Sequence, residues 1–291
     1  YSNAFTYFEK AANTGFTKAE FRLGLMYDEG KGVETDFEKA MFWYHRAARK
    51  NHYDAMGLIG LLFLCGQGLE HDPTKAQEWL TMAMDGNSSY ALYGFGEMYL
   101  DGLSVEADFS KAYDYLMKSS EKNNYYAQFR LGIMYLEGEL LPQNFNLALQ
   151  YLQKAGNQDY APAQLHLGHM YVNGNGVPQD FGVGFNWYKR AGELGHPGAS
   201  YMLGLYYKNG TVVPKSVSLA LEWFHRGAVL GEPNAQYELG KMYESGTGVA
   251  SSLEMANDWY TKAAEQGIEE ANAKVKSLSL KLKVKNFLSI F

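Results

Sequence analysis

The sequence has almost no cysteine and no long apolar run. Cys65 is the single cysteine among 291 residues, so no intramolecular disulfide can form. No apolar stretch reaches the roughly 18 residues of an α-helical membrane span, and the first residues lack the charged-then-apolar pattern of a secretory leader. Residues 1–16 instead resemble the second half of a repeat. We therefore expect a fragment of a longer chain, with bacterial cytoplasm, periplasm and secretion all open.

Positive charge is also scarce outside the C-terminal tail. The chain has 26 Lys and Arg against 32 Asp and Glu, a formal charge of −6. The tail Glu269–Phe291 carries +3 of this, which leaves −9 on the rest. A general nucleic-acid binder needs a basic stripe, so this class is excluded. The cationic, partly apolar tail leaves contact with anionic lipid open as a minor alternative.

What the chain does have is a glycine every 36 residues. A fixed period without insertions indicates stacked copies of one supersecondary unit, which form one continuous solenoid domain. We predict seven copies over 17–268, a half copy at 1–16, and a capping helix with a tail at 269–291, frayed or extended beyond about residue 285. The repeated glycines are Gly24, Gly60, Gly96, Gly132, Gly168, Gly204 and Gly240.

Each copy opens with the pattern of an amphipathic helix, here called helix A. An alanine, a leucine and an aromatic ring follow at spacings of four, as in Ala19, Leu23 and Tyr27, which places them on one helical face. Helix A is expected to end at a left-handed glycine cap in every copy. These caps are Gly30, Gly66, Gly102, Gly138, Gly174, Gly210 and Gly246.

A second helix, helix B, is predicted in the latter half of each copy. One column contains only N-cap residue types, and a later column contains only residues that tolerate a left-handed backbone. The predicted N-caps are Asp36, Asp72, Asp108, Asn144, Asp180, Ser216 and Ser252. The predicted helix ends are Gly15, Asn51, Asn87, Asn123, Asp159, Gly195, Gly231 and Gly267.

The repeated glycine lies inside helix A, where glycine costs about 1 kcal/mol relative to alanine. Seven such costs in one column indicate that a bulky side chain lies against the backbone there. We expect this to be a helix-B aromatic from the column Trp43, Trp79, Tyr115, Tyr151, Trp187, Trp223 and Trp259. Two copies depart from the common loop and are expected to differ in shape, at Leu140–Leu141–Pro142 and Val212–Val213–Pro214.

The composite pattern A-x-x-x-L-G-x-x-Y-x-x-G-x-G-V-x-x-D-x-x-K-A-x-x-W-Y-x-x-A-A closely resembles the Sel1-like repeat, a relative of the tetratricopeptide repeat. Residues 19–48 show it nearly complete. The predicted fold is an all-α, right-handed superhelix of helix pairs with a concave and a convex face. The resemblance implies an adaptor or scaffold that holds a protein or peptide in the concave groove, lined by helix A.

The helix-A columns that point away from the packing positions vary from copy to copy, as a binding surface would. In the second copy they are all apolar, and Leu58, Leu61 and Leu64 predict an apolar anchor for a partner. The alternative is that curvature or a second chain buries them. The candidate partner-binding residues are Arg22, Leu25, Leu58, Leu61, Leu64, Glu97, Arg130, Ile133, His166, His169, Met202, Lys208 and Lys241.

Catalytic and cofactor chemistry find no support in the sequence. His166 and His169 are three residues apart on one helix, but no third ligand has metal-site spacing, so we predict neither a metal nor a cofactor. No nucleophile and base recur in any copy. We predict a non-enzymatic binding protein, monomeric or weakly dimeric. The alternatives are a secreted bacterial factor that binds host proteins or anionic lipids, and a regulator or activator of an envelope hydrolase.

Overall fold

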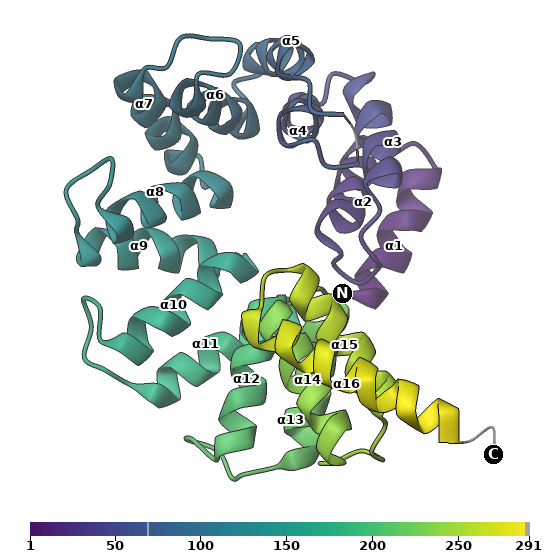
Figure 1. The fold of residues 1–291 in the computed structure, drawn as a ribbon. Helices are drawn as coiled ribbons and strands as arrows, with labels where there is room; N and C mark the ends of the chain where they lie inside the picture. The colour runs from purple at the N-terminus through teal and green to yellow at the C-terminus, as the bar shows by residue number, and fades with distance from the viewer. Residues whose placement is uncertain (69, 289–291) are drawn as a thin grey trace. The chain divides into compact units, whose positions relative to one another are not determined.

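The computed structural model describes residues 1–68 and 70–288, with side chains described through residue 282. Over this part of the chain it consists of 16 helices and contains no strand. Helices of the A and B types alternate along the sequence, and within each compact unit an A helix packs against the B helix that follows it, as α2 does with α3 and α12 with α13 (Figure 1). The predicted all-α solenoid of helix pairs is therefore confirmed.

The helix boundaries follow the 36-residue period. The A helices are α2 (Thr17–Glu29), α4 (Tyr53–Cys65), α6 (Ser89–Asp101), α8 (Tyr125–Glu137), α10 (Ala161–Asn173), α12 (Pro197–Asn209), α14 (Pro233–Ser245) and α16 (Glu269–Leu288). The B helices are α1 (Ser2–Asn13), α3 (Phe37–Ala48), α5 (Pro73–Met84), α7 (Phe109–Glu121), α9 (Phe145–Gly156), α11 (Phe181–Glu193), α13 (Val217–Val229) and α15 (Leu253–Glu265).

Local chemistry sets these boundaries, as the sequence predicts. All seven glycines that end helix A have a left-handed backbone, and all seven predicted N-caps of helix B accept a backbone N–H with the side chain. The column that ends helix B is left-handed too, even where it holds Asn or Asp, as in Asn51 and Asp159.

The side chain against the repeated glycine is not the one expected. A Cβ on Gly24 would lie 2.5 Å from the Tyr44 ring, and a Cβ on Gly204 would lie 2.4 Å from the Phe224 ring. The contact comes from the residue after the predicted aromatic, which differs in direction by about 100° around helix B. The residues observed against the glycine are Tyr44, Leu80, Leu116, Tyr188, Phe224 and Tyr260.

The predicted aromatic column packs between copies instead. The Trp187 ring lies 3.6 Å from the Cβ position of Gly156 in α9, and the Trp223 ring lies 3.0 Å from that of Gly192 in α11. A cation one turn further along helix B covers these rings, as Arg226 does over Trp223 at 4.6 Å. The aromatic column therefore joins one B helix to the preceding one.

The loop of the sixth copy keeps its left-handed step despite its sequence. Val212 has a φ of 66°, where other copies have glycines such as Gly176 and Gly248. A β-branched residue is strained in this conformation. The expected change of loop shape is therefore wrong at this position, because Val212 adopts the same left-handed backbone conformation as the glycines of the other copies.

The chain divides into two compact units, unit 1 (Tyr1–Leu141) and unit 2 (Pro142–Phe291). The division falls in the loop of the fourth copy, where Leu140–Leu141–Pro142 departs from the common pattern. Each unit has its own buried clusters, and each is described by itself below. The single continuous domain expected from the repeat stays a prediction.

The end of the described chain is one helix. α16 covers the last apolar edge with Ala271 and Leu278, both fully buried, as the predicted cap does. It continues to Leu288, so fraying beyond about residue 285 is not seen through that residue. Residues 289–291 of the predicted tail lie outside the described part. No helix of the described residues is long and apolar enough to cross a membrane.

Candidate functional site

The variable helix-A face of unit 1 is largely filled by the protein's own side chains. Leu58 is 2% exposed, Leu61 7% and Leu64 6%, and Leu25 and Ile133 are buried as well. This corrects the expectation of a solvent-exposed surface in the second copy. The burial arises within unit 1, in agreement with the alternative that curvature covers these leucines.

Aromatic rings from neighbouring copies supply the cover. The Tyr90 ring lies 6.3 Å from Phe21 of the first copy and 6.2 Å from Tyr126 of the fourth, between ring centroids. The Tyr125 hydroxyl at the start of α8 donates to the Glu29 carboxylate at the end of α2. Phe21, Tyr90 and Tyr126 belong to the same hydrophobic cluster as these leucines.

Two carboxyl groups within this face carry raised pKa values. Burial raises the pKa of Asp28 to about 7, even though the Tyr44 hydroxyl donates to it at 2.8 Å. Burial likewise raises the pKa of Glu97 to about 7, against the charge of Arg130, whose Nε lies 3.1 Å from Glu97 Oε1. Both groups are therefore partly protonated near neutral pH.

Other side chains complete the polar part of unit 1. Burial, and then the Glu97 and Asp28 carboxylates, raise the pKa of the Cys65 thiol, which is a poor nucleophile as a result. Arg22 is exposed at the start of the same face. The structure thus brings Glu97 and Arg130 together as a pair and places Arg22 in solvent.

The helix-A face of unit 2 is more open. Met202, Leu205 and Lys208 of α12 are half-buried, as are Glu238 and Lys241 of α14. Lys208 donates to Glu238 at 2.6 Å, and Lys241 donates to the same carboxylate at 2.9 Å. This pairing joins α12 to α14 and makes one surface of apolar and charged side chains.

Histidines extend this surface onto α10. The rings of His166 and His169 lie 6.2 Å apart between centroids, and His169 Nδ1 lies 2.8 Å from the Tyr188 hydroxyl. His196 caps α12 by accepting the Ala199 N–H at Nδ1. Burial, then the neighbouring imidazoles His169 and His196, lower the pKa of His166 to about 4. Among the residues that the structure describes, no three His, Cys, Asp or Glu are arranged to hold a metal ion.

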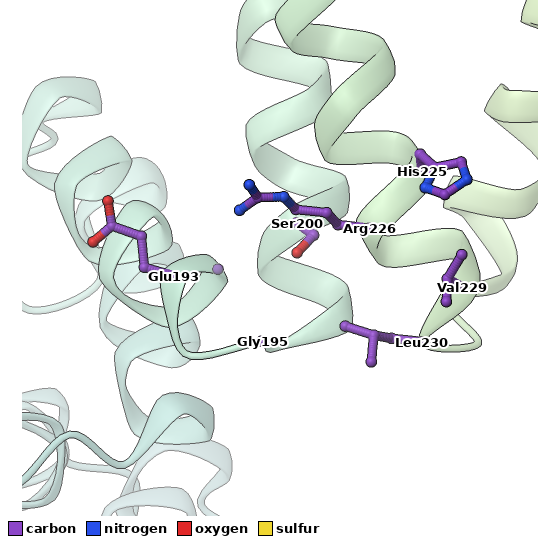
Figure 2. Close-up of a pocket in the computed structure, with 8 residues that line it drawn as sticks. Glu193, Gly195, Ser200, His225, Arg226, Val229 and Leu230 are labelled. Atoms are coloured by element: carbon purple, nitrogen blue, oxygen red, sulfur yellow. The ribbon is translucent and has the colours of Figure 1, made fainter. Parts of the chain in front are cut away.

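Two hollows on either side of α13 were not predicted from the sequence. One, of about 330 Å³, is lined by residues of α11 to α13, and Figure 2 shows Arg226 of α13 reaching toward Glu193 of α11. The other, of about 350 Å³, also includes Arg226, which pairs with Glu222 at 2.6 Å. The sequence feature that could have indicated the first hollow is Val229, an apolar residue in a repeat column that is otherwise polar. Its side chain is 62% exposed.

Sequence reasoning also missed the hydroxyl–carboxylate pairs over the repeated glycine. Tyr260 donates to Glu244 in the seventh copy as Tyr44 does to Asp28 in the first. The sequence does contain a pattern that could have predicted these pairs. An acidic residue occupies the Asp28 column only in copies where the Tyr44 column holds tyrosine.

Comparison with protein families identifies the repeat. The Sel1 repeat matches residues 1–16, 17–52, 54–88, 89–124, 126–160, 161–196, 197–231 and 233–268. The chain belongs to the Sel1 repeat family. Proteins built from Sel1 repeats are generally non-catalytic scaffolds for protein interactions.

Two solved Sel1-type structures resemble this chain over most of its length. A protective antigen of uropathogenic Escherichia coli is 32% identical with a TM-score of 0.63, covering 95% of this chain and 60% of that one. A Sel1 repeat protein from Oxalobacter formigenes is 31% identical with a TM-score of 0.67, covering 94% of this chain and 79% of that one. This chain therefore spans less than two thirds of the E. coli protein.

The curated relatives match a much smaller part. The DAP3-binding cell death enhancer 1 of Rattus norvegicus is 44% identical over 41 residues, which is 14% of this chain and 8% of the relative. The match is therefore little longer than one repeat of this chain.

Proposed function

We propose that this Sel1 repeat protein is a scaffold whose partner binds the helix-A face of unit 2. The observation that carries the proposal is the contrast between the two units. Apolar side chains of the unit 1 face such as Leu58 and Leu61 are buried, whereas Met202 and Leu205 at the same repeat positions of unit 2 stay half-buried.

The composition of the unit 2 face supports partner binding. Tyr201, Met202 and Leu205 supply apolar area from α12, and Tyr237 supplies more from α14. Tyrosine is enriched at energetic centres of interfaces, and methionine adapts its shape to varied partners. The Lys208–Glu238–Lys241 group lies beside them and carries one surplus positive charge at neutral pH.

The partner is first isolated on immobilised protein, identified, and produced in pure form. Its affinity is then measured for the wild type and for Met202→Asp, which places a charge in the centre of the face. We expect a loss of at least about tenfold, typical of a disrupted interface centre. Val229→Asp is the matched control, because Val229 lies exposed on α13 of the same unit.

A second variant guards against a folding defect. Lys241→Ala removes a partly exposed side chain of the same face and leaves the core of α14 intact. We expect weaker binding at an unchanged melting temperature. Full affinity in both face variants, or a loss confined to Val229→Asp, contradicts the proposal.

A further inference from the structure

Three histidines lie near one another at the α10 side of the unit 2 face. His166 and His169 lie one turn apart on α10, and His196 begins α12. Protonation of one ring would disfavour protonation of the others by charge repulsion. His169 and His196 both lower the pKa of His166, and His169 lowers that of His196. The cluster is therefore a set of hydrogen-bonding groups that stay neutral at pH 7.

The charged groups on the surrounding elements are paired with one another. Asp159, before α10, lies 3.3 Å from Arg190 of α11, and Glu193 of α11 lies 3.9 Å from Lys189. Lys208 of α12 pairs with Glu238 of α14. Tyr188, Tyr201, Tyr206 and Tyr207 are the tyrosines of α11 and α12. On α9, which packs against α10, Lys154 lies over the Tyr151 ring at 5.2 Å. Burial lowers the pKa values of all three histidines, and neighbouring imidazoles lower those of His166 and His196 further.

His196 is fixed in its neutral form by its role as a cap. Its Nδ1 accepts the Ala199 N–H, so its one proton is on Nε2. A second proton would break the cap and add a positive charge at a helix N-terminus, where the helix dipole opposes it. His196 therefore donates a hydrogen bond from Nε2 and does not readily take up a proton.

His169 has a partner that permits protonation. Its Nδ1 lies 2.8 Å from the Tyr188 hydroxyl, and a phenol hydroxyl both donates and accepts. The hydroxyl donates to the neutral ring and turns to accept from the protonated ring. The Tyr188 ring stays in place during this change because it packs against the backbone of Gly168.

We propose that the partner segment presents carboxylate side chains to His166, His169 and His196, and that its docking adds a proton to His169. The inference rests on the proposed function and adds the chemistry of the partner. A carboxylate accepts from Nε2 of His196 and forms an ion pair with protonated His169. The proton comes from solvent, and no covalent bond changes.

The charge of the rest of the face fits an acidic segment. Lys208 and Lys241 share the single carboxylate of Glu238, and Lys274 pairs with Glu244 on the neighbouring copies. Unit 2 has a formal charge of +1 only because residues 269–291 carry +3, so the positive charge next to the histidine face is that of Lys208 and Lys241. Complementary charge of this kind raises association rates and selects against basic partners.

The test uses acetyl-hexaglutamate amide as the probe and the hexaglutamine peptide as its neutral control. The pKa of His169 is measured by NMR in the full chain, with and without each peptide. We expect hexaglutamate to raise this pKa by at least about 0.5, and to bind about threefold or more tightly at pH 6 than at pH 7.5. Hexaglutamine leaves the pKa unchanged.

Two variants assign the effect. His169→Gln is expected to bind hexaglutamate with little pH dependence, whereas His225→Gln on α13 keeps the wild-type dependence. Acidification also protonates carboxylates of the protein and the peptide, and His225→Gln shares this change with the wild type, so it serves as the control for it. The NMR titration needs no variant, so it decides the question even if His169→Gln folds poorly.

An unchanged His169 pKa in saturating hexaglutamate overturns the inference, as does equal pH dependence in His169→Gln and the wild type. This failure is distinguishable from a failure of the proposed function. If the natural partner still loses affinity on Met202→Asp, the face binds a partner of different chemistry.

Discussion

The Tyr44 hydroxyl donates a 2.8 Å hydrogen bond to Asp28 Oδ2, while the Tyr44 ring lies against the backbone of Gly24. Tyr260 repeats this arrangement with Glu244 and Gly240 in the seventh copy. The two sites differ in burial, which is deep at Asp28 and partial at Glu244, and in a second donor, because Lys274 also donates to Glu244 at 2.8 Å. The same geometry therefore holds carboxyl groups whose pKa values shift in opposite directions.

Asp28→Asn is expected to stabilise unit 1 at pH 8 and to change little at pH 5. Burial raises the pKa of Asp28 to about 7 in the folded state, so the folded chain binds more protons than the unfolded chain between about pH 4 and 7. Stability consequently falls as pH rises through this window, by at most about 1.4 kcal/mol per pH unit for one group. Hydrogen exchange in α2 and α3 at both pH values measures the effect.

Glu244→Gln is the matched variant and should behave in the opposite way. Partial burial favours the protonated form, but hydrogen bonds from Lys274 and Tyr260 outweigh it and lower the pKa of Glu244. The stabilisation that ionised Glu244 provides is present above the pKa that this group has in the unfolded chain. It is lost as the pH falls through the lower pKa that Glu244 has in the folded chain. Glu244→Gln should weaken α14–α16 at pH 7. If both variants shift stability in the same direction at neutral pH, this electrostatic account is wrong.

Gly204→Ala should destabilise unit 2 by about 1–3 kcal/mol, because its Cβ would lie 2.4 Å from the Phe224 ring. Gly198→Ala in the same helix is the control. Its Cβ would meet side chains only at 3.5 Å or more, so it should be neutral or slightly stabilising. Thermal unfolding compares the two. Equal melting temperatures would show that close packing does not explain the repeated glycine.

Leu61→Asp should unfold or severely destabilise unit 1, because it places a carboxylate among the buried leucines of α2 and α4. Phe42→Asp in the same unit should be tolerated much better, since Phe42 is 54% exposed. Circular dichroism and urea unfolding provide the comparison. A Leu61→Asp protein with wild-type stability would restore the interpretation of these leucines as a partner anchor.

Val212→Gly should stabilise the protein by about 1 kcal/mol, which few substitutions to glycine do. Val212 has a φ of 66° and is 54% exposed, so glycine relieves strain and loses little packing. Val213→Gly removes a side chain that packs against the core and should destabilise. The two melting temperatures should therefore move in opposite directions, and a drop in both argues against strain at Val212.

Repeat register, helix types and caps could be predicted from the sequence because each depends on chemistry within a few residues. Gly30 and Asp36, for example, specify their own backbone conformations. The contact on Gly24 could not be assigned to Tyr44, because its column contains Tyr, Leu and Phe and looks less regular than the neighbouring tryptophan column.

The burial of Leu58 could not be predicted because it depends on packing between copies. Tyr90 and Tyr126 join the cluster that contains Leu58 only once the third and fourth copies have packed beside the first two. Copy-to-copy variation marked the same columns in both units, but it did not distinguish a buried face from a more exposed one. That distinction needed the three-dimensional arrangement.

Hydrogen exchange of the protein with its isolated partner tests the central claim most directly. The account predicts slower amide exchange in α10, α12 and α14 of unit 2 on complex formation, with α4 and α13 unchanged. Protection confined to α4, or to the outer hollows beside α13, would contradict the assignment of the binding surface to the helix-A face of unit 2.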